Sequence, residues 1–93
     1  MENYYLKNDE SLDIKFKGRI IAGSHNCYDE TFVMYETAKG ATVCEKVTLN
    51  DKCEFTRKAA ICCLPNEIID FFGYSQLAKN LYEQASIRHW IET

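Results

Sequence analysis

The sequence predicts an α+β protein, in which an antiparallel sheet of four to five strands is followed by two helices packed on one of its faces. Two observations lead to this fold class. Residues 11–63 fall into segments that alternate between apolar and polar side chains, which is the period of strands, whereas residues 65–85 follow the helical period. A run of strands followed by a run of helices is the pattern of α+β proteins, so the helices are expected to cover one face of the sheet.

The composition is that of a folded protein, and we expect one domain spanning residues 1–93. Hydrophobic residues make up 46% and charged residues 27% of the chain, which disfavours disorder. The net charge of −3 disfavours a dedicated nucleic-acid-binding protein. The polar N-terminus does not resemble a secretory signal, and the longest apolar run, 59–64, is too short to span a membrane. We therefore expect a cytoplasmic protein with reduced cysteines.

The first strand is expected over residues 11–23, because its side chains separate cleanly into two faces. The apolar face, which we expect to pack against the helices, consists of Leu12, Ile14, Phe16, Ile20 and Ala22. The other face carries Asp13, Lys15, Lys17 and Arg19. Residues 1–10 are interpreted as a short edge strand or an arm, and residues 24–30 as a loop rich in turn formers.

Three more strands follow from the distribution of β-branched and aromatic residues. Segments 31–37 and 41–49 flank Gly40, which can adopt the positive φ of a tight hairpin. Segment 53–63 is predicted as a further strand with Phe55, Ala59 and Ile61 facing inward.

Two helices are indicated by their end signals as well as by their period. Pro65 suits the first turn of one helix and Gly73 its end, with Ile68, Ile69, Phe71 and Phe72 as its apolar face. Ser75 is a suitable N-cap for a second helix. The buried stripe of that helix is expected to be Leu77, Ala78, Leu81, Tyr82 and Ala85. Residues 86–93 could form a last strand or a helical turn.

Several aromatic residues do not fit the inward faces and are candidates for partner contacts, because aromatic side chains are favoured at interfaces. They are Tyr4, Tyr5, Tyr28, Tyr74 and Trp90. Lys15, Lys17 and Arg19 would steer a charged partner toward them. The leading functional hypothesis is a protein-binding or self-associating module that uses these aromatics and an open sheet edge.

Two alternatives remain open from the residues. A small ligand could bind between the sheet and the helices, in a pocket lined by Phe16, Met34, Phe71, Phe72 and Tyr82. Nucleic acid could bind the basic face of the first strand, although that face has no clear aromatic platform for stacking bases.

Catalytic and metal chemistry are disfavoured by the residue pattern. His25, Cys27 and Asp29 share one loop and could form an activated thiol, but no known catalytic signature surrounds them. Cysteines at 27, 44, 53, 62 and 63 could supply zinc ligands with His25, yet their spacing does not match a zinc knuckle. We therefore expect no catalytic residue, no metal and no cofactor, and interpret most cysteines as small apolar core residues.

The segment from Glu10 to Ile14 reads ESLDI and is followed downstream by YETAKG at 35–40. With these two motifs the chain resembles the small bacterial EXLDI family. The resemblance implies a small protein of a bacterium or a mobile element, and implies no activity and no site residue. The segment 71–85 is similar in style to accessory proteins of plasmids, phages or integron cassettes. An accessory role as an antitoxin, an immunity factor or an inhibitor of host defence is the expectation that follows.

Overall fold

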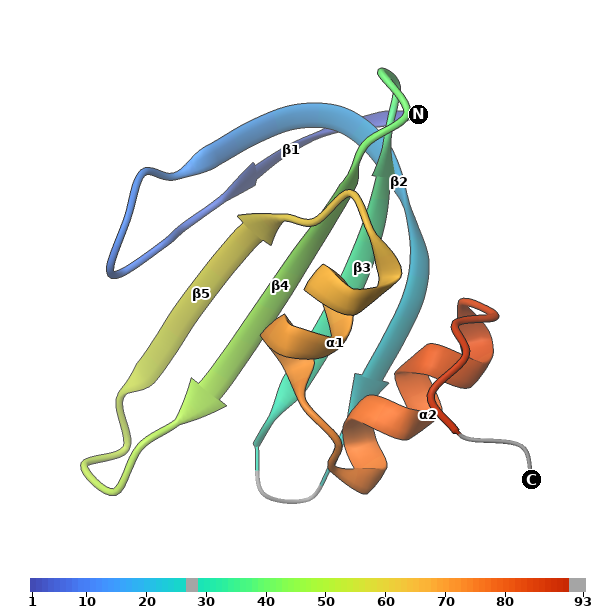
Figure 1. Cartoon of the computed structure of the whole chain (residues 1–93). Helices are drawn as coiled ribbons and strands as arrows, with labels where there is room; N and C mark the ends of the chain where they lie inside the picture. Colours follow the sequence, from blue (N-terminus) through green and yellow to red (C-terminus); the bar gives the residue numbers. More distant parts are fainter. Residues whose placement is uncertain (27–28, 91–93) are drawn as a thin grey trace.

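The computed structural model describes residues 1–26 and 29–90, and within these it contains a five-stranded antiparallel sheet followed by two helices (Figure 1). The strands are β1 (Glu2–Leu6), β2 (Ile14–His25), β3 (Thr31–Thr37), β4 (Thr42–Leu49) and β5 (Phe55–Ile61), and the helices are α1 (Pro65–Phe72) and α2 (Gln76–Gln84). The strands lie in the sheet in chain order, as a meander. The predicted α+β class is confirmed. In the described residues, no helix is both long and apolar enough to cross a membrane.

The predicted turn and cap residues act as expected. Gly40 has φ 87° in the hairpin between β3 and β4, and Gly73 has φ 83° directly after α1, both values that favour glycine. Pro65 occupies the first position of α1. The Ser75 hydroxyl accepts a hydrogen bond from the Ala78 N–H at 3.2 Å and so caps α2.

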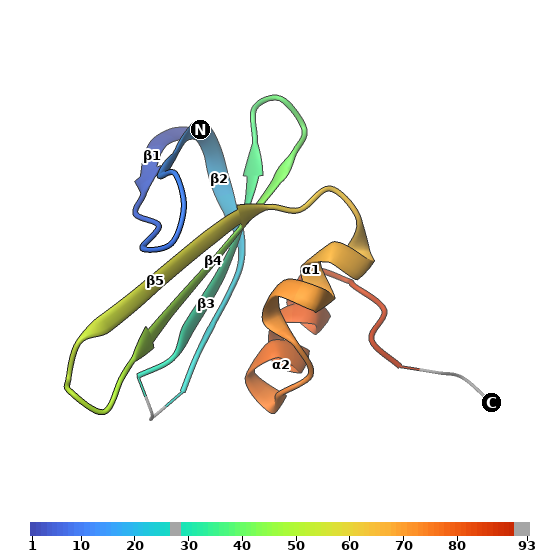
Figure 2. The same cartoon turned by 60° about the vertical axis from the view of Figure 1, so that its left-hand side comes forward.

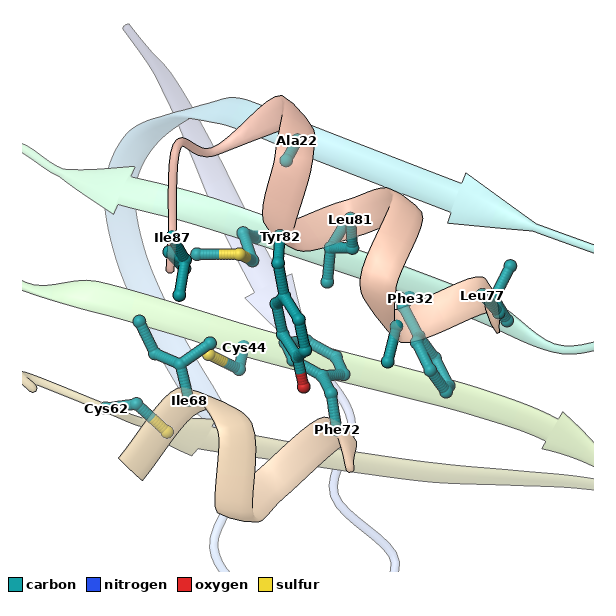
Figure 3. Close-up of a cluster of buried hydrophobic side chains, with 12 residues drawn as sticks. Ala22, Phe32, Cys44, Cys62, Ile68, Phe72, Leu77, Leu81, Tyr82 and Ile87 are labelled. Atoms are coloured by element: carbon teal, nitrogen blue, oxygen red, sulfur yellow. The ribbon is translucent and has the colours of Figure 1, made fainter. Parts of the chain in front are cut away.

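Both helices lie on one side of the sheet, and the larger hydrophobic core fills the space between them and the strands (Figure 2). Figure 3 shows Tyr82 from α2 and Phe72 from α1 meeting over the strands. The buried members of this helix-side core are Ala22, Phe32, Met34, Cys44, Cys62, Ile68, Phe72, Leu77, Ala78, Leu81, Tyr82 and Ile87. It includes most of the predicted stripe of α2, while Ala85 is only partly buried.

The apolar residues of β2 do not share one face, which corrects the prediction for this strand. A bulge lies between Ile20 and Ala22, so the residues on either side of it point to opposite faces of the sheet. Ala22 belongs to the helix-side core, whereas Ile14 and Phe16 pack on the other face. Leu12 is 86% exposed in the turn before the strand, and Asp13 also precedes it.

A second, smaller core lies on the face that the helices do not cover. Its buried members are Leu6, Tyr35, Val43 and Ala59, with Tyr4, Ile14, Phe16 and Val33 packed at its margin. The β1–β2 hairpin curls over this part of the face (Figure 2). The sheet is therefore apolar on both sides, with helices covering one side and its own first hairpin covering part of the other.

The β1–β2 connection is fastened to β5 at the far side of the sheet. The Asp9 N–H donates to the Arg57 carbonyl at 2.9 Å, and the Arg57 N–H donates to the Asp9 carboxylate at 2.8 Å. The Asn8 side-chain amide donates to the Ala59 carbonyl at 2.7 Å. These three bonds, which we name the clasp, join segments about fifty residues apart and bend the sheet toward a partial barrel.

Other boundaries and orientations differ from the prediction. Ser24 and His25 extend β2 rather than starting a loop. In β5, Phe55 and Ile61 are exposed rather than inward-facing, while Ala59 is buried on the face away from the helices. Residues 86–90 form neither a strand nor a helix, although Ile87 is buried; residues 91–93 of the predicted last element lie outside the described part.

Tyr82 places a phenol inside the helix-side core. Its hydroxyl donates to the Gly73 carbonyl at 2.5 Å, which ties α2 to the end of α1. Burial raises the pKa of Tyr82 to about 12 from an ordinary value of 10.0, with smaller contributions from Tyr74 and Cys44. The unfolded chain therefore loses this proton at lower pH than the folded chain. The resulting stability is fully present below pH 10 and is lost as the pH rises toward 12.

Tyr82→Phe is accordingly expected to flatten the pH dependence of unfolding between pH 10 and 12. At neutral pH it should lower the free energy of unfolding by about 0.5–1.5 kcal/mol, because the bond to Gly73 is lost. Urea unfolding at a series of pH values measures both effects. Tyr5→Phe is the control, because it makes the same change at an exposed phenol. Equal alkaline slopes for wild type and Tyr82→Phe would contradict this assignment.

Candidate functional site

The aromatic residues predicted as partner contacts do not form one surface. Tyr4 stacks on Phe16 at 5.3 Å and meets Tyr35 at 4.8 Å between ring centroids, so it belongs to the smaller core. Tyr5 is exposed on the opposite face of β1, where its hydroxyl donates to Asp13 at 3.0 Å. Tyr28 lies outside the described residues.

Tyr74 and Trp90 do come together, beside the two helices. They line a cleft of about 520 Å³ with Ile69, Arg88 and His89. Tyr74 is 69% and Trp90 is 58% exposed, so both rings are accessible there. The Nε2 atom of His89 is buried without a hydrogen bond among the described residues, and lies 3.9 Å from a carboxylate oxygen of Glu83.

The basic residues predicted on the first strand separate into two environments. Arg19 pairs with Glu36 across β2 and β3, at 3.1 Å between Nη2 and Oε1. Lys15 and Lys17 are exposed and line a pocket described below. The three side chains therefore do not act as one unpaired basic stripe.

The residues of the predicted ligand pocket are likewise divided between the two faces. Met34, Phe72 and Tyr82 are buried in the helix-side core. Phe71 lies at the margin of that core, where the Lys46 ammonium donates to its carbonyl at 3.0 Å and sits 5.2 Å from its ring centroid. Phe16 packs on the other side of the sheet.

The thiols are divided between buried and exposed positions. Cys44 and Cys62 are buried together in the helix-side core, where burial raises the pKa of both and keeps them protonated. Cys53 and Cys63 are exposed and free. Of the candidate thiol loop, His25 and Asp29 lie within the described residues and Cys27 lies outside them. No metal-ligand cluster of three or more His, Cys, Asp or Glu side chains occurs in residues 1–26 and 29–90.

Part of the sheet face opposite the helices is left uncovered beyond the clasp. We call this surface the open face and define it by its apolar residues, which are Ile20, Val33, Val47, Leu49 and Phe55. Ile20 and Phe55 are more than half exposed, and the other three are half-buried. Leu49 stands directly opposite Phe55 across β4 and β5, so these two side chains form an apolar pair at one end of the open face.

The open face was missed by the sequence prediction, which placed Phe55 inside. A signal for it is present in β3, where apolar residues occupy both parities. Phe32 and Met34 alternate with Val33 and Tyr35. Such strands need cover on both faces of the sheet, and two short helices can supply only one.

A separate pocket of about 270 Å³ opens where β2 parts from β3. We call it the lysine-rimmed pocket. It is lined by Ile14, Lys15, Phe16, Lys17, Thr37, Ala38, Lys39, Ala41, Val43 and Ile61. The pocket brings together Phe16, Lys15 and Lys17, which the sequence assigned to different hypothetical sites. Lys39 joins them from the β3–β4 hairpin and Ile61 from the end of β5.

Comparison of the chain with family models, curated proteins and solved structures finds no match. The architecture defines an α+β protein with an antiparallel meander, and any functional assignment depends on the surfaces described above.

Proposed function

We propose that this protein is an interaction module that self-associates through the open face. The observation that carries the proposal is the group of exposed and half-buried apolar side chains on a sheet face that no helix covers. Single exposed apolar side chains are common on protein surfaces, but contiguous ones are typical of binding sites. The apolar residues of the open face come from four neighbouring strands, with Ile20 on β2, Val33 on β3, Val47 and Leu49 on β4, and Phe55 on β5.

Charge complementarity supports a second copy of this chain as the occupant. The open face carries the acidic side chain of Glu45 on β4 and the basic side chain of Arg57 on β5. The Glu45 carboxylate already accepts from the Tyr35 hydroxyl at 2.8 Å and can accept further hydrogen bonds. The Arg57 guanidinium lies 5.9 Å from the Phe55 ring centroid. A two-fold axis between two such faces would place Arg57 of each copy near Glu45 of the other.

The first test is the solution mass measured by light scattering over a range of concentrations. We expect a concentration-dependent species of twice the 10.8 kDa chain mass. Phe55→Glu should raise the dimer Kd at least about tenfold, because it buries an unpaired carboxylate in an apolar contact. Leu12→Glu is the matched control, since Leu12 is exposed but lies outside the open face. A wild-type monomer at every concentration would overturn the proposal.

Charge reversal tests the orientation of the two copies. Glu45→Arg and Arg57→Glu should each weaken association, and the double variant should recover it, because the pairing is restored with its signs exchanged. If the double variant loses as much association free energy as the two single variants lose together, the two-fold pairing is excluded.

We further propose the cytoplasm as the compartment. The supporting feature is the odd number of cysteines with two of them adjacent, Cys62 and Cys63, which is a poor framework for disulfides.

A further inference from the structure

The lysine-rimmed pocket exists because β2 changes partners along its length. From Ile14 to Lys17 the strand pairs with β1 alone, and pairing with β3 begins at Gly18. The Ala38 N–H donates to the Lys17 carbonyl at 2.7 Å and closes one corner of the gap. The pocket therefore has the first part of β2 as one wall, and the β3–β4 hairpin with the end of β5 as the other.

The interior of this pocket is predominantly apolar. Phe16 and Ile14 line it from β2, and Val43 and Ile61 face them from β4 and β5. Val43 stands directly opposite Ile61 across the two strands, so these two side chains form a continuous apolar wall. Ile61 is more than half exposed, which leaves apolar surface at the opening for a ligand to cover.

The charged residues at the pocket have a single sign. Lys15, Lys17 and Lys39 line it, and no acidic side chain does so among the described residues. Among the described residues, Lys7 is paired with Asp13, Arg19 with Glu36 and Lys58 with Glu10, whereas none of the three pocket lysines has an ion pair. In a protein of net charge −3, this is a local reversal of sign. The long lysine stems allow the ammonium groups to reach the pocket mouth.

We propose that the lysine-rimmed pocket binds a small amphipathic anion, a monocarboxylate whose apolar body lies against Phe16, Val43 and Ile61. The apolar walls would bury the body of the ligand, and the lysines would contact the carboxylate at the mouth. A volume of about 270 Å³ corresponds to roughly nine water-sized groups at about 30 Å³ each, which is the size of a medium-chain fatty acid.

This inference is independent of self-association, because the pocket and the open face share no residue. Failure of either proposal therefore leaves the other standing. The two can be measured separately, the first by ligand titration and the second by solution mass.

The test is titration of the full chain with octanoate, followed by NMR shifts of the Ile61 methyl and Phe16 ring signals and by calorimetry. We expect saturable binding at one site, with octanol binding more weakly and octylamine not at all. Equal binding of octanol and octanoate would overturn the role of the lysines. Absence of saturable octanoate binding up to millimolar concentration would overturn the site.

Three variants locate the binding. The double variant Lys15→Gln with Lys39→Gln should raise the octanoate Kd about tenfold, because two ionic contacts are removed. Lys52→Gln is the matched control, since Lys52 is an exposed lysine in the β4–β5 turn. Ala41→Leu should abolish binding by filling the pocket, with folding checked by circular dichroism. Unchanged affinity in both pocket variants would place the ligand elsewhere.

Discussion

Replacing Phe72 by alanine is expected to lower the free energy of unfolding by about 3–5 kcal/mol, as for other large-to-small changes in a packed core. Phe72 is 5% exposed at the end of α1. Its ring lies 5.0 Å from the Phe32 ring on β3 and 4.9 Å from that of Phe71, measured between centroids. The change therefore removes one of the main contacts between α1 and the sheet, alongside that of Ile68. Thermal unfolding should show a midpoint lowered by more than about 12 °C.

Phe55→Ala provides the matched comparison, because it is the same change at a side chain that is 56% exposed. We expect a loss below about 1 kcal/mol, since little apolar area returns to water. Measurement at the lowest practical protein concentration separates this effect from any contribution of association. Similar losses for the two variants would mean that Phe55 is buried as deeply as Phe72, and would remove Phe55 from the open face.

The second large effect is expected at Gly18, where β2 takes up its second partner. A Cβ atom at this position would lie 2.3 Å from the backbone oxygen of Glu36, so β2 and β3 approach too closely for any side chain. Gly18→Ala should cost about 1–3 kcal/mol, because the two strands must move apart. Urea unfolding monitored by circular dichroism gives the magnitude.

Gly23→Ala is the control on the same strand. Its Cβ would have one neighbour, the Phe32 carbonyl oxygen at 4.0 Å, which is an ordinary contact. The two hydrogen bonds between Gly23 and the Gln84 side chain involve only backbone atoms of Gly23 and remain available. We expect a neutral or slightly stabilising change. Equal destabilisation by the two substitutions would show that the close approach at Gly18 is not the cause.

Local features of the fold were predictable because their signals are local. Pro65, Gly73 and Ser75 mark helix ends through their own backbone and capping chemistry, and Gly40 marks its turn in the same way. The order of the strands and helices follows from the change of period, which needs no tertiary information. These are the parts of the fold that the structure confirms.

The path of the sheet in space was not predictable on the same grounds. Alternation along β2 suggests a single apolar face. The bulge between Ile20 and Ala22 turns the following side chains to the opposite face, and no glycine or proline lies at the bulge itself. The curl that brings Asn8 and Asp9 to β5 depends on hydrogen bonds between distant segments. The open face depends on which side of the sheet the helices and the first hairpin cover, and the lysine-rimmed pocket depends on where β2 changes partners, so their residues were either assigned elsewhere or missed. Tyr74 and Trp90 were predicted as exposed aromatics, but their meeting in one cleft depends on the fold of residues 86–90.

The clasp also covers part of an exposed sheet edge. β5 is an edge strand, and an edge strand offers free backbone groups to any other strand, including one from an identical chain. Asn8 and Asp9 occupy the backbone groups of Arg57 and Ala59 that an incoming strand would need in the middle of this edge. Loss of the clasp would therefore expose β5 to edge-to-edge growth into fibres, without unfolding the helix-side core.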